Sequence, residues 1–376
     1  MRKQKIWLSS PHIGENEFKY VADAFSLNWI APVGPHIDKF EEELSKISND
    51  KYVAALSSGT SAIHLALILL DVSTDDEVIC SSFTFSASAN PIIYQKANPI
   101  FVDSELDTWN ICPIKLEECI IDRISKGKKP KAIIVVHLYG MPAKMNEIIE
   151  IANKYEIPII EDAAEALGSK YYGYPLGCLS DFGVFSFNGN KIITTSGGGA
   201  LLSSDINKIK KAKFLATQAR DEYPHYEHSQ IGYNYRLSNV SAAIGLGQLE
   251  VLKERVVRRR NIFEYYKKKL SNISEISFLE EKNGSYSNRW LTTIIVCKES
   301  SISTDDIRLS LENENIESRP LWKPMHLQPV FKDCAYYGAS NAEYLFNNGL
   351  CLPSGSNLSN DDLDRIINKI VKIFEK

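Results

Sequence analysis

The sequence predicts an α/β protein in which a mostly parallel sheet is covered by helices on both faces, followed by a smaller C-terminal α/β domain. Between residues 52 and 203, short apolar runs typical of buried strands alternate with segments of helical periodicity. The chain has 376 residues, of which 44% are hydrophobic, so it can bury a large core and is expected to divide into two domains. We place the first domain at residues 1–250 and the second at residues 251–376.

The elements of the first domain follow from the periodicity of its apolar residues. Helical patterns at 17–27 and 37–47 precede the first strand, and the loop between them contains Trp29, which could contact a substrate or simply pack. Strands are predicted at 52–56, 77–81, 100–103, 132–136, 158–161, 182–187 and 199–203. Helices are predicted at 60–70, 114–125, 145–155 and 241–250.

The second domain begins with a basic, aromatic helix at 254–270. RNA binding could explain this composition, but the apolar residues recur at helical spacing with the charges on the other side, which favours a solvated charged face. Strands near 289–297 and helices near 304–313, 342–347 and 361–374 are predicted to complete the domain.

Composition argues against several classes of protein. A net charge of −4 and a pI near 6.0 provide no general field for nucleic acid, so a small-molecule site is favoured. The seven cysteines are scattered without a Cys-x-x-Cys pair, which is typical of reduced thiols in a cytoplasmic protein. We expect no signal peptide and no membrane span, and the spacings of histidine and cysteine predict no metal site.

Lys191 is the candidate nucleophile. It lies between the predicted strand at 182–187 and the glycine triplet 197–199, where the backbone can turn sharply and approach a ligand. A lysine on a tight turn at a strand end can lose its proton more easily, which imine formation with an aldehyde requires. By itself, Lys191 is better explained as a solvated surface lysine before a glycine turn, since most lysines are solvated.

Two further stretches complete a possible cofactor site. Asp162 ends a predicted strand, and a carboxylate in the crevice at that edge could keep a pyridine nitrogen protonated. Ser57, Gly59 and Thr60 lie where another strand meets a helix, which is a favourable place for a phosphate, although a plain N-cap would also explain the hydroxyls. Together with Lys191, these features predict a pyridoxal 5′-phosphate (PLP) site.

Two aromatic or titratable residues also follow predicted strands. Phe85 could stack on a flat ring in the same crevice, or it could fill the core. His137 could be a catalytic base, but such a histidine is more often a hydrogen-bonded wall residue, and we assign it no role.

The ordered motifs resemble those of the DegT/DnrJ/EryC1/StrS sugar aminotransferases. They are SGTSA at 58–62, FTFSAS at 83–88, EDAAEALG at 161–168, the Lys191 stretch at 185–199 and GYNYRLS at 232–238, and the resemblance runs from about residue 11 to residue 353. Within this family, the sequence is most similar to enzymes that place the 4-amino group on a UDP-linked 4-keto-6-deoxy-N-acetylglucosamine, the bacillosamine or legionaminic acid type.

The resemblance implies a fold, a chemistry and an assembly. The fold would be that of the type I PLP-dependent transferases, and the protein would be a homodimer with shared active sites that takes L-glutamate and a nucleotide sugar. PLP would bind to Lys191 with Asp162 at its ring nitrogen, and Asn234 of the neighbouring subunit would reach the phosphate. The remaining implied cofactor contacts are Ser57, Gly59, Thr60, Phe85, Glu165, Ser186 and Asn188, and the implied substrate contacts are Trp29, Arg236, Arg319 and His326.

Two positions depart from the family pattern. Many relatives carry histidine where this chain has Asn188, and glutamine or histidine is common where Glu165 stands near the phenolic oxygen of the cofactor. An ionised Glu165 would repel a phenolate. Glu165 is therefore expected either to share a proton at that oxygen or to contact the sugar.

Three alternative functions remain compatible with the fold. A dehydratase branch of the same fold replaces the PLP-binding lysine by histidine, and Lys191 argues against it. A 3-keto-sugar aminotransferase would carry the same cofactor residues. A non-catalytic sensor or regulatory protein would be expected to lack the lysine or to carry a basic DNA-reading module, and the sequence shows neither feature.

Overall fold

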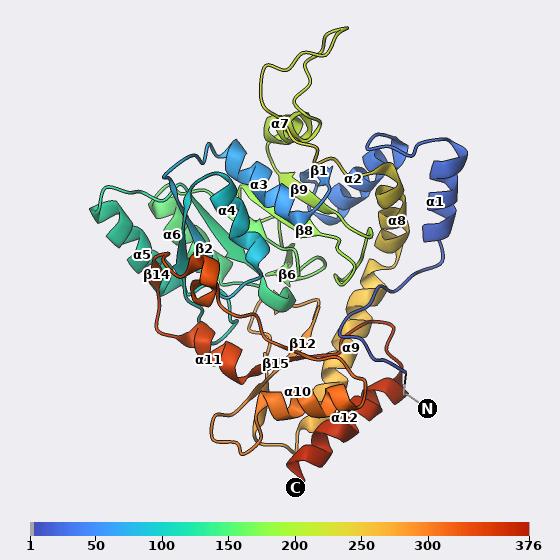
Figure 1. Cartoon of the computed structure of the whole chain (residues 1–376), viewed down its shortest axis with the longest axis vertical. Helices are drawn as coiled ribbons and strands as arrows, with labels where there is room; N and C mark the ends of the chain where they lie inside the picture. Colours follow the sequence, from blue (N-terminus) through green and yellow to red (C-terminus); the bar gives the residue numbers. More distant parts are fainter. Residues whose placement is uncertain (1–3, 376) are drawn as a thin grey trace.

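An eight-stranded sheet forms the centre of the structure, a computed structural model that describes residues 4–375. The strands lie in the order β1-β9-β8-β5-β4-β2-β3-β14 (Figure 1). They are β1 (Tyr52–Leu56), β2 (Glu77–Ser81), β3 (Asn98–Val102), β4 (Ala132–Val136), β5 (Ile159–Asp162), β8 (Phe182–Ser186), β9 (Gly199–Ser203) and β14 (Tyr336–Tyr337). Only β9 runs antiparallel to its neighbours, β1 and β8, so the predicted mostly parallel sheet is confirmed.

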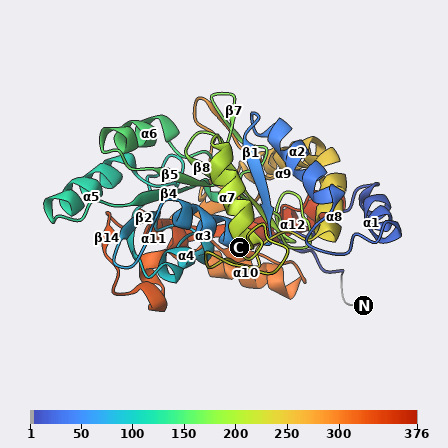
Figure 2. The same ribbon diagram turned by 90° about the horizontal axis from the view of Figure 1, so that it is seen from above.

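Both faces of this sheet are buried under helices because its strands carry apolar side chains on both sides. In β4, Ile133 and Val135 belong to one hydrophobic cluster while Ile134 belongs to the other. The first face is covered by α2 (Pro35–Ile47), α5 (Pro113–Ser125), α6 (Met145–Lys154) and α8 (Asn239–Glu250), and the second by α3 (Gly59–Leu69), α4 (Asn90–Tyr94) and α7 (Ile206–Ala216). Figure 2 shows α5 and α6 on one side of the strands and α3 and α4 on the other.

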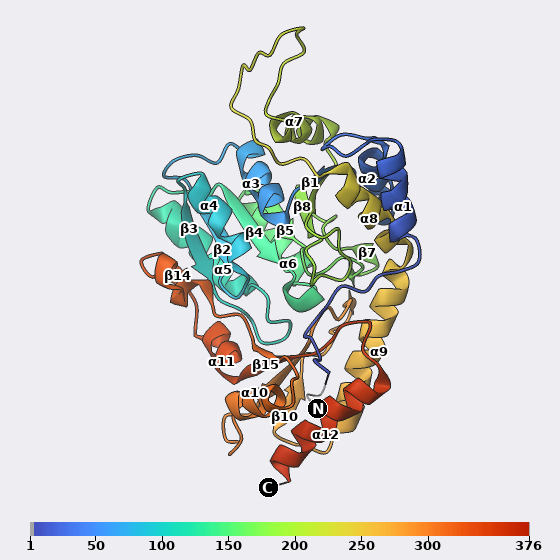
Figure 3. The ribbon, with the colours of Figure 1, turned by 45° about the vertical axis from the view of Figure 1, so that its right-hand side comes forward.

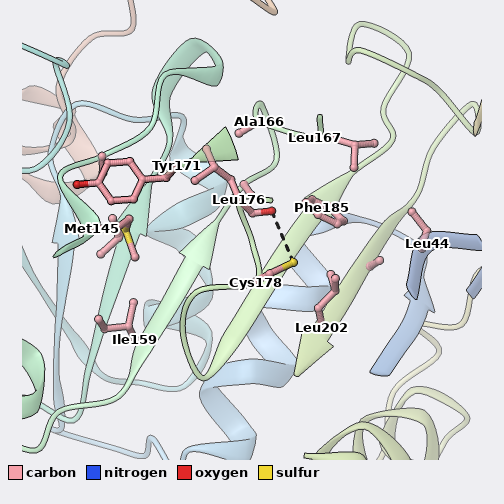
Figure 4. Packing of buried hydrophobic residues seen from close by; sticks show 14 of the residues in the cluster. Leu44, Met145, Ile159, Ala166, Leu167, Tyr171, Leu176, Cys178, Phe185 and Leu202 are labelled. Carbon is pink, nitrogen blue, oxygen red and sulfur yellow. Dashed lines mark hydrogen bonds between the residues drawn. The ribbon is translucent and has the colours of Figure 1, made fainter. Parts of the chain in front are cut away.

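The cluster on the first face connects the sheet to the segment after β5. Met145, Ile159 and Phe185 pack there with residues of the turns that follow Asp162 (Figure 4). Complete burial of an isoleucine or phenylalanine side chain contributes about 1.5–3 kcal/mol. The carboxyl ends of β5 and β8 are therefore held firmly where the functional side chains begin.

A second, antiparallel sheet lies below the first in the view of Figure 1. Its order is β10-β12-β15-β13, with β10 (Ile276–Phe278), β12 (Thr292–Val296), β13 (Arg319–Pro320) and β15 (Gly349–Leu352). The helices α9 (Leu252–Leu270), α10 (Thr304–Asn313) and α12 (Asn360–Phe374) pack with it around a separate hydrophobic cluster. The amphipathic pattern of these helices explains why they cover this sheet.

Several contacts cross the predicted domain limit at residue 250. The short strand β14 joins the central sheet, and Ile6 packs in the cluster of the second sheet. A three-stranded sheet of β11 (Ser285–Tyr286), β6 (Lys170–Tyr171) and β7 (Tyr174–Pro175) also joins both parts of the chain. The division into 1–250 and 251–376 stays a prediction, and its outer limits at residues 1 and 376 lie outside the described residues.

Most predicted helices and strands are present, with one correction in α9. The remaining helices are α1 (Glu17–Ser26), which packs on α8, and α11 (Asn341–Asn348), and the short 3-10 turns are η1 (Ser86–Ser88), η2 (Leu138–Gly140), η3 (Met325–Leu327) and η4 (Pro329–Phe331). The prediction that the charged side of α9 is solvated holds for Lys268 and Lys269 but is wrong for Arg255 and Arg259. Both arginines are buried because the N-terminal segment lies across that part of the helix.

The chain between α7 and α8 extends away from the rest of the molecule. It forms the long loop beyond α7 at the top of Figures 1 and 3. At its base, the backbone N–H groups of Tyr233 and Tyr235 donate to the carbonyl oxygens of Leu215 and Ala216. The loop is thus attached to α7 at its base, and it carries the exposed side chains of Tyr226 and Ile231.

Candidate active site

A cavity of about 360 Å³ lies at the carboxyl ends of β5 and β8, within the usual size of a small-molecule site. The beginning of α3, the segment after β2, the turn after β8 and two tryptophans complete its wall. Its lining residues are Ser57, Ser58, Gly59, Thr60, Ile63, Thr84, Phe85, Ala87, Ser88, Val136, Asp162, Ala164, Glu165, Ser186, Asn188, Asn190, Lys191, Gly197, Gly198, Trp290 and Trp322. Open parallel sheets place ligands at this edge.

Lys191 enters the cavity from the turn after β8. The turn is closed by backbone hydrogen bonds from Phe187 to Gly198 and from Lys191 to Asn188. The Lys191 Nζ atom lies 3.6 Å from Glu165 Oε1 and 4.1 Å from the centre of the Trp290 ring. Among the lining residues, Lys191 is the one basic side chain, and only 12% of it is exposed.

Asp162 faces the cavity from the last position of β5. Its Oδ2 accepts a hydrogen bond of 2.6 Å from the Ser88 hydroxyl, and its Oδ1 accepts one of 3.1 Å from the Ala164 backbone N–H. The Ser88 hydroxyl is itself 2.8 Å from Thr84 Oγ1. These contacts fix the orientation of a carboxylate that is only 5% exposed.

The start of α3 forms the polar end of the cavity. Ser58 is the N-cap, and its hydroxyl accepts from the Ser61 backbone N–H in a capping box. A Cβ atom on Gly199 would lie 2.3 Å from the carbonyl carbon of Ser58, so this glycine allows α3 to approach β9 closely. Free N–H groups and hydroxyls at a helix start favour an anion such as phosphate.

Glu165 lies beside Lys191 in a buried, polar position. Its Oε2 accepts from the Tyr139 backbone N–H at 2.7 Å, and its Oε1 accepts from Trp322 Nε1 at 3.3 Å. Burial raises the pKa of Glu165, an effect that Lys191 opposes and the charge of Asp162 reinforces. The side chain therefore binds a proton more readily than an exposed glutamate.

An aromatic wall closes the other side of the cavity. Phe85 is about half exposed, and its ring is 6.1 Å from that of Trp322 in an edge-to-face arrangement. Trp290 lies deeper, at 1% exposure, and is stacked near Tyr139. A flat ligand could therefore meet ring faces as well as polar groups.

His137 does not line the cavity and belongs to a buried polar network. The Ala143 backbone N–H donates to its Nδ1 at 3.1 Å, so the ring proton is assigned to Nε2, which faces Glu161 at 3.0 Å. The Glu161 carboxylate also accepts from the backbone N–H groups of Gly177 and Leu179. His137 is a hydrogen-bonded residue beneath the sheet edge, in agreement with the second interpretation of the sequence.

The comparison with known protein families identifies the chain. The model described as the DegT/DnrJ/EryC1/StrS aminotransferase family matches residues 11–371. The chain belongs to this family. EpsN of Bacillus subtilis (strain 168), a putative pyridoxal phosphate-dependent aminotransferase, is 51% identical over 375 residues, which cover 99% of this chain and 96% of EpsN.

Two further family comparisons concern a named enzyme and a solved structure. GDP-perosamine synthase of Escherichia coli O157:H7 is 36% identical over 364 residues, with 97% of each chain covered. The structure of the putative sugar aminotransferase Spr1654 from Streptococcus pneumoniae in its PLP-form matches with a TM-score of 0.91 and 28% identity over 99% of each chain. The predicted fold class, the PLP cofactor and the sugar aminotransferase class are confirmed.

The cavity has the chemical groups that this family's cofactor needs. Three groups line one space. Lys191 supplies an amine, Asp162 supplies a buried carboxylate, and residues 57–60 supply a helix start with hydroxyls. Gly59 also has little room, because a Cβ atom there would lie 3.2 Å from Ser186 Cβ. These residues fit PLP, whose aldehyde, ring nitrogen and phosphate require a nucleophile, an acid partner and an anion site.

The structure brings most predicted cofactor residues together and leaves five predicted residues outside the cavity. Arg236 donates to the Ala55 carbonyl and pairs with Glu41, Arg319 is exposed beside Glu317, and Trp29 is exposed on the loop before α2. His326 is bonded to the Ser82 hydroxyl at 2.6 Å. Asn234 is exposed at the base of the loop between α7 and α8.

Sequence reasoning missed several lining residues. Ser58, Thr84, Ser88, Asn190, Trp290 and Trp322 all line the cavity. Trp322 lies in the same Pro-bounded segment as Arg319 and His326, so the sequence points to this segment but not to the side chain that lines the cavity. No local pattern marks Trp290, which lies two residues before β12 of the second sheet and about a hundred residues from Lys191.

Within residues 4–375, neither a membrane-spanning helix nor a metal cluster is found. No helix there is long and apolar enough to cross a membrane. No group of three or more histidine, cysteine, aspartate or glutamate side chains in that range could hold a metal ion. The seven cysteines are free thiols.

Proposed function

We propose that this enzyme transfers the amino group of L-glutamate to the C4 keto group of a UDP-linked 4-keto-6-deoxy-N-acetylhexosamine, for the synthesis of a bacterial surface glycan or glycoprotein sugar. Sugar aminotransfer follows from the family. The donor, the keto position and the nucleotide rest on the resemblance of the motifs and are the proposed part.

One observation carries the catalytic assignment. The Lys191 amine and the Asp162 carboxylate line the same cavity, one after β8 and the other at the end of the neighbouring strand β5. When bound, PLP supplies the aldehyde that carries the amino group between substrates and the ring that accepts electrons from the reacting carbon. We assign Lys191 to binding the cofactor and moving protons, and Asp162 to holding the proton at the ring nitrogen.

The other lining residues orient the reactants. Ser57, Gly59, Thr60 and Ser186 would hold the phosphate, because they surround the start of α3. Phe85 would cover one face of the ring. The raised pKa of Glu165 supports the first of its two alternatives, a proton shared with the phenolic oxygen. Asn188, which is exposed at the rim, would meet the cofactor or the sugar.

The proposed assembly is a cytoplasmic homodimer with shared sites. Asn234 is exposed and lies outside the cavity of its own chain, as a residue that serves a partner's site must. Exposed aromatic and aliphatic side chains on the projecting loop, such as Tyr226 and Ile231, support burial against a second copy. The proposed substrate contacts require that the partner or a side-chain movement brings these residues to the sugar. They are Trp29, Arg236, Arg319 and His326.

The test is a transamination assay with a defined panel of acceptors. The purified protein would be incubated with PLP, L-glutamate and 4-keto or 3-keto sugars linked to UDP or GDP, with amino-sugar and 2-oxoglutarate products measured by mass spectrometry. GDP-linked acceptors are included because one relative is named a GDP-perosamine synthase. We expect the wild type to form both products in equal amounts with the UDP-linked 4-keto sugar, and the Lys191→Ala variant to form neither. Turnover confined to a GDP-linked or 3-keto acceptor would overturn the proposed substrate.

A further inference from the structure

The peptide bond before Lys191 is held by two side chains from distant parts of the chain. The Asn190 carbonyl oxygen accepts a hydrogen bond of 2.7 Å from Ser9 Oγ and another of 2.7 Å from Trp290 Nε1. The Trp290 ring also lies 4.1 Å from the Lys191 Nζ atom. One tryptophan thus contacts both the backbone that carries the lysine and the amine at the end of its side chain.

The two donors are themselves held by a buried arginine. Arg259, on α9, donates to the Trp290 carbonyl oxygen and, at 2.9 Å, to Ser9 Oγ. Only 1% of Arg259 is exposed. The contacts close a ring of four residues, Arg259, Ser9, Asn190 and Trp290, from four separate segments. Burying a guanidinium is costly, and a ring of this kind is a geometric constraint that local turn residues could not supply.

We propose that Trp290 is a positioning residue that sets the direction of the Lys191 amine, with Ser9 and Arg259 fixing Trp290 and the Asn190 carbonyl. A lysine has a flexible four-carbon stem, so its amine needs an external constraint to face a reacting atom repeatedly. The indole face attracts the ammonium form, and the indole N–H fixes the backbone from which the stem starts. The inference rests on the proposed role of Lys191.

The variants separate the two contacts of Trp290. Trp290→Phe keeps an aromatic face but loses the N–H, whereas Trp290→Leu loses both. Ser9→Ala removes the other donor to Asn190, and Ser9→Thr restores a hydroxyl at a partly exposed position. The matched control is Trp7→Leu, because Lys5 Nζ lies 4.1 Å from the Trp7 ring centre, the same distance, on an exposed tryptophan outside the cavity.

The readouts are PLP uptake by the apoprotein and steady-state kinetics with glutamate. Uptake is followed by visible absorbance and by mass spectrometry of the Lys191 adduct trapped with borohydride. We expect about a 3–10-fold slower uptake and lower kcat for Trp290→Phe and Ser9→Ala, and about 30–100-fold for Trp290→Leu, since misplacement by about 1 Å can cost about 100-fold. KM values should stay within about threefold, and Ser9→Thr and Trp7→Leu should resemble the wild type.

The outcomes distinguish a positioning role from a structural one. A folded Trp290→Leu protein with wild-type uptake and kcat would overturn the proposal, as would a loss confined to KM or an equal loss in Trp7→Leu. If Trp290→Leu does not fold, the Ser9 variants provide the test. Wild-type uptake and kcat in Ser9→Ala, or an equal loss in Ser9→Thr, would then overturn the proposal. PLP uptake needs no sugar, so it tests Trp290 independently of the substrate. If the variants show the expected uptake effects but no acceptor is turned over, the proposed substrate is rejected and the role of Trp290 stands.

Discussion

Glu165 is acted on by two groups of opposite charge and is deeply buried, and this environment gives it a distinct pH behaviour. Lys191 Nζ is 3.6 Å from its Oε1, while Asp162 contributes a negative charge to the same cavity. Burial is the largest cause of its raised pKa, because the ionised form loses hydration. The native apoprotein therefore binds this proton more tightly than the unfolded chain does.

We predict that Glu165→Gln changes how the stability of the apoprotein depends on pH. A raised pKa in the folded state means that the contribution of Glu165 to stability is fully present below its unfolded value of about 4.5 and is lost as pH rises through the folded value. The glutamine variant should therefore gain stability relative to the wild type as pH rises. The gain should be about 1.4 kcal/mol for each unit by which the pKa of Glu165 is higher in the folded protein than in the unfolded chain. Urea unfolding between pH 4 and 8 measures this. Parallel curves, as expected for the exposed control Glu299→Gln, would contradict it.

Asp162 is predicted to act through its charge and not through its shape. Asp162→Asn keeps a side chain of the same size, and its amide oxygen can still accept from Ser88, whose hydroxyl now bonds to Oδ2. The amide cannot hold a protonated pyridine nitrogen, so the loss should be several kcal/mol of barrier, or on the order of a thousandfold in kcat. The variant should still bind PLP, seen as visible absorbance. A kcat within a few-fold of the wild type would show that the carboxylate has another role.

The sequence predicts those site residues that follow strands and misses those that arrive from elsewhere. Asp162 and Lys191 could be found because a strand pattern ends beside each of them. Trp290 and Trp322 contact the same space only because the second sheet packs against the first, and no local spacing encodes that contact. The charge of Arg319 makes it a candidate in the sequence, but the fold places it on the surface beside Glu317.

At the scale of elements, the start of α3 has both a structural and a proposed binding role. Ser58 caps this helix with Ser61, and Ser303 caps α10 with Asp306 in the same way. Of these four residues, only Ser58 lines the cavity. The two helix starts therefore allow the contribution to folding to be separated from the contribution to phosphate binding.

We predict that Ser58→Ala and Ser303→Ala each lower the free energy of unfolding by about 1 kcal/mol, because each removes one N-cap acceptor. Only Ser58→Ala should weaken PLP binding, since Ser58 lines the cavity and its hydroxyl orders the helix start by accepting from the Ser61 backbone N–H. Denaturant unfolding and equilibrium titration with PLP measure the two effects. Equal PLP affinities in the two variants would mean that the phosphate lies elsewhere.

The length of an element decides whether the sequence reveals it. Strands β1, β4 and β8 have five residues each and a clear apolar pattern, so the sequence predicts their positions. The strands β6, β7, β11 and β14 have two residues each, too few for any period. They form where packed segments meet, so tertiary contacts and not local propensity create them.

At the scale of the whole molecule, the loop between α7 and α8 projects away from the rest of its chain (Figure 1). Asn234 stands at its base, where the Thr217 backbone pairs with it in a single antiparallel bridge. The side chain is exposed and absent from the lining of its own cavity. We therefore propose that Asn234 contributes to catalysis by reaching another copy of the chain, which closed two-fold symmetry permits.

The last prediction is that two inactive variants restore activity when they share a dimer. Lys191→Ala leaves Asn234 intact, and the bulky replacement Asn234→Trp leaves Lys191 intact. In a mixed dimer, one site receives both wild-type residues and the other receives neither. Because half of the dimers are mixed after random association and each has one working site, co-expression should restore up to about a quarter of wild-type activity. Activity is measured on the unfractionated mixture and also on mixed dimers purified through two different affinity tags, after both parents are shown to be folded and dimeric. The purified mixed dimers should reach up to about half of wild-type activity, because each has one working site of two. Verified mixed dimers without activity would mean that each chain builds its site alone.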